Sequence, residues 1–307
     1  MISREEFKER CKKLIPQEEL EKIEKDKKMQ NNITKIVITV EVVFSLIVAF
    51  STSFFALSTL PVSIIFSILI INVVFTSKRD NLKEKYASDI IKILMEGFEY
   101  SFQGEEFLDK KIYCESGFGS KRFDDYKGED LLIVDIPKND GTPSGVKLNI
   151  CDLRVTEEDE KRNSDGSTSS TTDTVYKGVL GYVKFPFKFK CNLNINNHDW
   201  DMEKIVLEDI NFNKKFKVYT DNQLEALVIL TPTMMNKLMA FSQRVNGFKI
   251  SIKKEGKMYL GMSRNLFELV VSSKVSFDAL FGRFYDDISN ILAIVNEIKD
   301  NDKVFKM

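Results

Sequence analysis

The sequence predicts an α+β protein in which a two-helix transmembrane hairpin precedes a cytosolic mixed domain with a mainly antiparallel sheet and flanking helices. Three patterns support this prediction. Residues 36–77 form a run of 42 residues in which Glu41 is the only charged side chain. Apolar residues occupy every second position of 183–195, and an apolar stripe with spacings of four and three crosses 277–298. The expected parts are 1–32, the hairpin 33–77 and the domain 78–307.

The uncharged run is long enough for two membrane crossings, because a bilayer core takes about 20 helical residues. Pro61 divides the run near its middle, in a position where proline can open a new helix. We therefore expect helices over 33–57 and 60–77. The run begins only after some thirty mostly polar residues and is too long for a signal peptide. The hairpin is expected to remain in the mature protein.

Basic residues flank both ends of the hairpin, whereas the connecting turn has no charge. By the positive-inside rule, both termini should be cytosolic. Glu41 is expected to lie level with Lys78 and Arg79 and to pair with one of them at the headgroups. The alternative is a neutral Glu41 that is hydrogen-bonded to Asn72 within the bilayer.

Helices are expected on both sides of the hairpin. Ser3 and Glu6 have the spacing of a capping box, and Pro16 separates this first helix from a second short one. These N-terminal helices should pack on the main domain or lie along the membrane surface. After the hairpin, residues 81–103 read as one helix.

Alternating apolar positions predict the strands. They occur in 131–136, 146–150, 183–195, 212–218 and 248–252. Pro186 in the middle of 183–195 suggests an edge strand or a bulge. Residues 156–174 contain no apolar side chain and begin with an acidic cluster, so we expect a mobile loop there.

The C-terminal part predicts two helices. Thr231 and Pro232 are a typical helix start, and Gly247 a typical end. The stripe in 276–299 has the a/d spacing of a coiled coil, but Leu280 and Leu292 widen it. We favour a helix that covers the sheet of its own domain, with self-association as the alternative.

Several strands expose lysine on their polar face. The candidate surface for anionic lipid headgroups or a protein partner comprises Lys184, Lys188, Lys190, Lys215 and Lys217. The competing interpretation is that these lysines protect strand edges against aggregation. Nucleic acid is not expected as a partner, because the aromatic residues fall on the apolar face of these strands.

One group of carboxylates could bind a metal ion or serve in acid/base chemistry. It consists of Asp124, Asp125, Glu129 and Asp130. A solvated turn before a strand explains the same residues equally well. His198 is the single histidine, the four cysteines have no C-x-x-C spacing, and no phosphate-binding or zinc-protease motif occurs. We therefore expect no cofactor, no metal site and no disulfide.

Three segments resemble a bacterial family that is known as domain of unknown function 3137. They are Lys127–Asp130, Val175–Gly178 and Phe212–Tyr219, followed by Asp221 and Leu230–Pro232. The resemblance would cover residues 86–296 with a paired membrane segment upstream. It implies a bacterial inner-membrane protein and assigns no activity, cofactor or catalytic residue.

The expected function is a membrane-anchored cytosolic binding or scaffolding module, and a non-enzymatic role is favoured over an enzymatic one. Its partners would be the bilayer, anionic headgroups, another membrane protein or a second copy of the chain. Two alternatives remain open at this stage. One is a carboxylate-dependent, metal-assisted enzyme at Asp124–Asp130, and the other is a membrane effector that assembles through the C-terminal helix.

Overall fold

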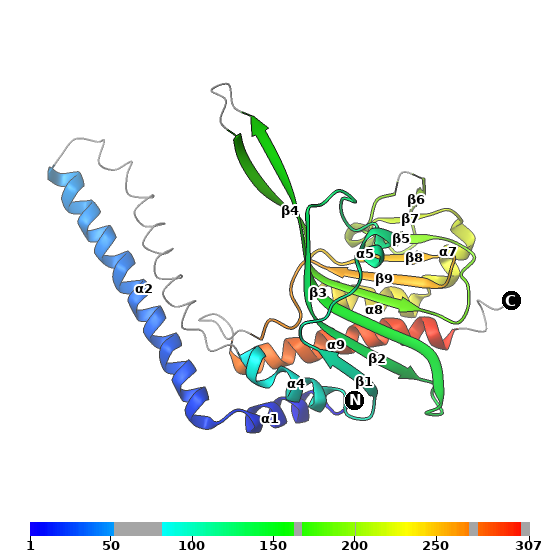
Figure 1. The fold of residues 1–307 in the computed structure, drawn as a ribbon, viewed down its shortest axis with the longest axis horizontal. Helices are drawn as coiled ribbons and strands as arrows, with labels where there is room; N and C mark the ends of the chain where they lie inside the picture. The colour runs from blue at the N-terminus through cyan, green and yellow to red at the C-terminus, as the bar shows by residue number, and fades with distance from the viewer. Residues whose placement is uncertain (52–81, 163–167, 200, 270–275, 302–307) are drawn as a thin grey trace. The chain divides into compact units, whose positions relative to one another are not determined.

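The protein is an α+β structure built on one nine-stranded antiparallel sheet (Figure 1). The computed structural model describes residues 1–51, 82–162, 168–199, 201–269 and 276–301. Two compact units can be distinguished. The helical unit comprises Ser3–Ile93 with Leu269–Arg283, and the sheet unit comprises Met1–Ile2, Leu94–Glu268 and Phe284–Met307.

The helical unit contains α1 (Arg4–Leu14), α2 (Gln17–Ser51) and most of α4 (Leu82–Leu94). The hydroxyl of Ser3 accepts a hydrogen bond from the Glu6 amide at 3.2 Å, which confirms the predicted cap. Phe7 of α1 is fully buried and packs edge-on against Phe281. The carboxylate of Glu19 accepts hydrogen bonds from Lys85 and Tyr86, which joins α2 to α4.

Helix α2 runs without interruption from Gln17 to Ser51. It therefore joins the second short helix expected before residue 32 to the first part of the predicted membrane helix. The second predicted membrane helix and the end of the first lie outside the described residues. Within the described ranges, no helix alone combines the length and apolar composition that a bilayer crossing needs. The bent pair α7 (Gln223–Ile229) and α8 (Pro232–Ser242), at 71°, passes that test only as a pair.

The predicted helix over 81–103 is too long. Helix α4 ends at Leu94, and Glu99–Gln103 form strand β1, which pairs with β2 (Asp125–Pro137). Gly97, with φ of +86°, lies between them. Glycine adopts this left-handed conformation easily and commonly follows a helix end. The apolar residues of 99–103 thus belong to a period of two and not to the helical period.

The strand order in the sheet is β1-β2-β3-β4-β9-β8-β5-β7-β6. The remaining strands are β3 (Pro143–Arg162), β4 (Thr168–Lys184), β5 (Leu193–Ile195), β6 (Glu203–Ile205), β7 (Val218–Thr220), β8 (Lys249–Lys253) and β9 (Lys257–Met262). On one face, α5 (Lys110–Ser116) contributes Tyr113 to a core with Cys151, Leu180 and Tyr259. We call this the α5 face.

Most of the predicted loop over 156–174 is not a loop, because its two ends are strands that pair with each other. Residues Thr156–Arg162 of β3 pair with Thr168–Thr174 of β4, and only 163–167 lie outside the described chain. The absence of apolar side chains misled the prediction. Ladder hydrogen bonds are made by the backbone, so strands that start in the core of a sheet can continue beyond it.

The alternating burial is confirmed for 183–191 but not at Asn194, which is buried, and the segment is not one strand. Strand β4 ends at Lys184, and the chain then crosses the tip of the β8–β9 hairpin to reach β5 on the other side. The Phe185 amide donates to the Gly256 carbonyl at 2.7 Å, and the Phe189 amide donates to the Lys254 carbonyl at 3.1 Å. Phe185, Phe187 and Phe189 are buried beneath the tip with their rings in mutual contact.

The predicted strand over 212–218 is wrong for its first half, because Ile210–Lys215 form helix α6. The Asp209 carboxylate accepts from the Asn211 and Phe212 amides and so starts this helix. Phe212 and Phe216 remain buried with ring centroids 4.6 Å apart. Their spacing of four fits a helix as well as a strand, so the pattern was ambiguous.

The two predicted C-terminal helices are present. Thr231 caps α8 by accepting from the Met234 amide at 3.1 Å, although α8 already ends at Ser242. Helix α9 spans Phe277–Asp300. The residues of its predicted stripe are all buried within this chain: Phe277, Leu280, Phe281, Phe284, Ile288, Ile291, Leu292, Val295 and Ile298. The stripe therefore packs internally, as favoured, and leaves no apolar seam for self-association.

We predict that Gly256→Ala lowers the thermal stability of the full chain far more than Gly141→Ala. Both glycines have positive φ, +79° and +81°. A methyl group at Gly256 would lie 2.1 Å from the Phe187 carbonyl oxygen, whereas Gly141 has no atom within 4 Å. The control costs about 1 kcal/mol for its backbone alone, and Gly256→Ala should cost about 1–3 kcal/mol more. Equal melting temperatures would contradict the close approach at the tip.

Candidate anion-binding surface

The predicted carboxylate group does not converge. Asp125 pairs with Lys127 at 2.7 Å, and Asp124 accepts a hydrogen bond from the Glu158 amide. Glu129 is exposed, but Asp130 is buried with φ of +66°. No group of three or more His, Cys, Asp or Glu side chains in the described chain is arranged to hold a metal ion. The geometry that a shared metal or acid/base site requires is therefore missing.

His198, the single histidine, lies near the surface. Its side chain is exposed, and its ring stands edge-on to Tyr219 at 5.0 Å. The four cysteines are free thiols, and three of them are buried. Burial raises the pKa of the Cys151 thiol to about 12, so this group is an apolar core residue and not a nucleophile.

The five predicted lysines are all exposed, but they do not form one group. Lys184 is the last residue of β4, and Lys188 and Lys190 follow it on the connection across the hairpin tip. Lys215 ends α6 and Lys217 precedes β7, near the other end of β5. The sheet thus divides the predicted surface and assigns new neighbours to Lys184.

Strand register places Lys184 in a row of four lysines on the α5 face. Lys147 of β3 is opposite Lys184, Lys184 is opposite Lys257 of β9, and Lys257 is opposite Lys253 of β8. We call these four residues the lysine row. With neighbouring strands about 4.8 Å apart, the row extends over about 14 Å.

Like charges directly opposite each other destabilise a sheet, so the row opposes folding unless another group compensates it. Protection of sheet edges does not explain it, because β3, β4, β9 and β8 are all interior strands. Lys184 and Lys253 make no ion pair with any other residue of the described chain. A shorter cationic row, Lys127–Arg154–Lys177, crosses the opposite face of β2, β3 and β4.

Two carboxylates partly compensate the lysine row. Glu115 of α5 accepts from Lys257 and from the Tyr259 hydroxyl, both at 2.7 Å. The hydrogen bond from Lys257, followed by that from Tyr259, holds the pKa of Glu115 below its ordinary value. The same contact raises the pKa of Lys257. At the other end, Asp135 of β2 pairs with Lys147 at 3.2 Å.

A pocket of about 450 Å³ adjoins the row beside Lys147. Glu99, Asp135 and Lys147 line it together with residues of the β2–β3 turn, including Pro137, Ser144 and Gly145. Glu99 is opposite Asp135, which is opposite Lys147, so the lysine row continues into two acids. The pocket therefore lies where the charge of the face changes sign.

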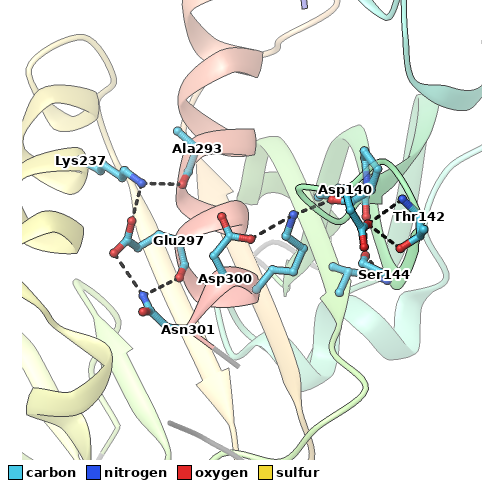
Figure 2. Close-up of polar contacts among 12 residues, drawn as sticks. Asp140, Thr142, Ser144, Lys237, Ala293, Glu297, Asp300 and Asn301 are labelled. Carbon is cyan, nitrogen blue, oxygen red and sulfur yellow. Dashed lines mark hydrogen bonds and ion pairs between the residues drawn. The ribbon is translucent and has the colours of Figure 1, made fainter. Parts of the chain in front are cut away.

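The turn that walls this pocket is fixed by polar contacts (Figure 2). Asp140 accepts from the Thr142 amide and hydroxyl, and Ser144 donates to the Ile136 carbonyl. Lys299 of α9 donates to the Pro137 carbonyl at 2.6 Å.

Helix α9 is in turn bound to α8. Lys237 pairs with Glu297 at 2.5 Å and also donates to the Ala293 carbonyl. The Asn301 side chain donates to Glu297 on the other side. Lys299 thus connects the pocket wall to α9, and Lys237 connects α9 to α8. These contacts favour a preformed shape of the pocket.

The sequence pointed to only one residue of the row, because the other three become neighbours through strand register. One signal was available. Lys253-Lys254-Glu255-Gly256-Lys257 stands between two apolar strands and is typical of a tight hairpin. That reading would have paired Lys253 with Lys257. No local signal indicates that Lys184 lies beside this hairpin or that Lys147 lies beside Lys184.

The fold and this surface define an α+β protein with an antiparallel sheet and a concentrated cationic face. Residues 174–299 match the family described as protein of unknown function DUF3137, which supports assignment of this stretch to that family. The match is narrower than the 86–296 expected. It includes the second and third resembling segments but not Lys127–Asp130.

Two further comparisons were made. The chain aligns with the crystal structure of the mycobacterial trehalose monomycolate transport factor A, TtfA, with 9% identity and a TM-score of 0.35. The alignment covers 71% of this chain and 91% of that one. A score of this size supports no conclusion about function. The curated proteins contain no match to this sequence.

We predict that Glu115→Gln destabilises the full chain at neutral pH by about 1 kcal/mol, the upper end of the scale of a partly exposed ion pair. Because the folded-state pKa lies below the ordinary 4.5, the stabilisation is present above that value and is lost as the pH falls through the folded pKa. Melting temperatures measured from pH 7 down to pH 3 should therefore converge. Glu208→Gln, at an exposed site, is the control. A pH-independent difference would disprove the assignment.

Proposed function

We propose that this chain is a membrane-anchored binding module, with both termini in the bacterial cytosol, that engages anionic ligands through the lysine row. The observation on which this rests is the row itself. Four lysines on interior strands raise the free energy of the folded state, and an anionic ligand would lower it again. The membrane gives such a surface a high local concentration of anionic headgroups.

The anchor is proposed from the composition of 36–77 and from the surface of α2. Four aliphatic side chains are exposed between residues 36 and 43 of this helix: Ile36, Ile38, Val40 and Val43, at 61%, 37%, 60% and 49%. Exposed apolar side chains that follow one another along a helix favour lipid as their solvent. The length of the run and Pro61 support two crossings, and the positive flanks support a cytosolic position for both termini.

The two alternative functions receive less support. An enzyme at Asp124–Asp130 would need these carboxylates to face one cavity, and they are instead separated between the surface and the core. Assembly through α9 would need an apolar seam, and its stripe is buried inside the chain.

The anchor predicts how the intact chain fractionates. After ultracentrifugation of a detergent-free bacterial lysate, the chain should sediment with the membranes and should resist washing with high salt. Salt resistance separates a hydrophobic anchor from attraction by the lysine row alone, since ionic contacts are screened. Tags at both termini should be inaccessible from outside the cell. Recovery in the supernatant would refute the anchor.

The lysine row predicts protection from chemical modification. With the full chain in nanodiscs, acetylation of Lys184 and Lys253 should be several-fold slower in phosphatidylglycerol than in phosphatidylcholine, and high salt should abolish the difference. Lys204 is the matched control, because it is exposed and is opposite Tyr219. Equal rates for Lys184 in the two lipids would refute the surface.

A further inference from the structure

The pocket beside Lys147 lies at the one place where the charged row on the α5 face changes sign. Across six strands the row reads Glu99, Asp135, Lys147, Lys184, Lys257 and Lys253. A purely anionic ligand uses only the basic part of this sequence. The position of a cavity at the junction points to a ligand that carries both charges.

The charges on either side of the junction are available to such a ligand. Asp135 and Lys147 pair with each other through Oδ2 and Nζ. Their outer neighbours, Glu99 and Lys184, are exposed, and neither forms an ion pair with another residue in the described ranges. A bound zwitterion could therefore interact with an unpaired carboxylate on one side and an unpaired ammonium on the other.

The dimensions of the pocket fit a small ligand. A volume of about 450 Å³ lies within the range of about 300–1,000 Å³ that is typical of small-molecule sites. Phe98, Pro137 and Pro143 supply apolar walls, and the turn is held by Lys299. Gly141 and Gly145 add wall surface without side chains, so the ligand could approach the backbone there.

We propose that this pocket and Lys184 bind an aminoalkyl phosphate of the phosphoethanolamine type. The phosphate lies on Lys147 and Lys184, and the ammonium group lies against Glu99 and Asp135. A two-carbon linker separates the two charges by about one strand spacing of ~4.8 Å. This inference deepens the proposed function and rests on it, because the basic half of the site is the end of the lysine row.

The test uses the full chain in a neutral detergent and calorimetric titration with O-phosphoethanolamine, inorganic phosphate and ethanolamine. Glu99→Gln and Lys184→Gln should each weaken O-phosphoethanolamine binding by about two- to five-fold, the scale of an exposed ion pair. Inorganic phosphate should respond to Lys184→Gln alone, and ethanolamine to Glu99→Gln alone. The control variants Glu208→Gln and Lys204→Gln, at exposed positions outside the site, should change none of these affinities.

Nanodiscs then distinguish a lipid headgroup from a free metabolite. Phosphatidylethanolamine should slow acetylation of Lys184 in a manner that Glu99→Gln reverses, whereas phosphatidylcholine, whose quaternary amine has no N–H donor, should not. Protection by free O-phosphoethanolamine but not by the lipid assigns the site to the soluble compound.

The outcomes separate the two proposals. If Glu99→Gln leaves O-phosphoethanolamine binding unchanged while Lys184→Gln still weakens phosphate binding, the inference fails and the anion-binding function stands. If no phosphate compound binds, and Lys184→Gln has no effect, both proposals are wrong.

Discussion

The position of the β8–β9 hairpin is the constraint on which the rest of the sheet depends. The hairpin lies between β4 and β5, and the chain that connects those two strands crosses its tip. Backbone hydrogen bonds from Phe185 and Phe189 fix the tip, and Gly256 leaves room for the Phe187 carbonyl. A slip by one residue would turn every side chain of β8 and β9 to the opposite face.

That register places four lysines opposite one another, and the repulsion between them raises the free energy of the folded state. The net charge of the chain is only −1, so the lysine row reflects the local arrangement and not an overall basic composition. Lys184, Lys253 and Lys257 lie inside the stretch that matches the DUF3137 family, whereas Lys147, Asp135 and Glu99 lie before it. The proposed zwitterion site therefore joins the matched stretch to the part of the sheet that precedes it.

Buried polar side chains hold the segment that follows β9 in its place. Asp152 of β3 is buried and accepts hydrogen bonds from the Leu266 and Phe267 amides, which holds the segment after β9 against the sheet. Arg264 of that segment pairs with the buried Asp287 of α9. Breaking either contact would leave a buried charge without compensation, so both are expected to be structural requirements.

The sequence by itself determined the fold class, the caps at Ser3 and Thr231, and helix α9, because these signals come from residues within one or two turns of each other. It failed where one pattern fits two structures, as at Phe212 and Phe216, or where a strand continues without apolar side chains, as in 156–174. Only the tertiary structure decided which lysines stand together. Register between distant strands depends on the whole sheet, so Lys147, Lys184, Lys253 and Lys257 become one surface only after folding.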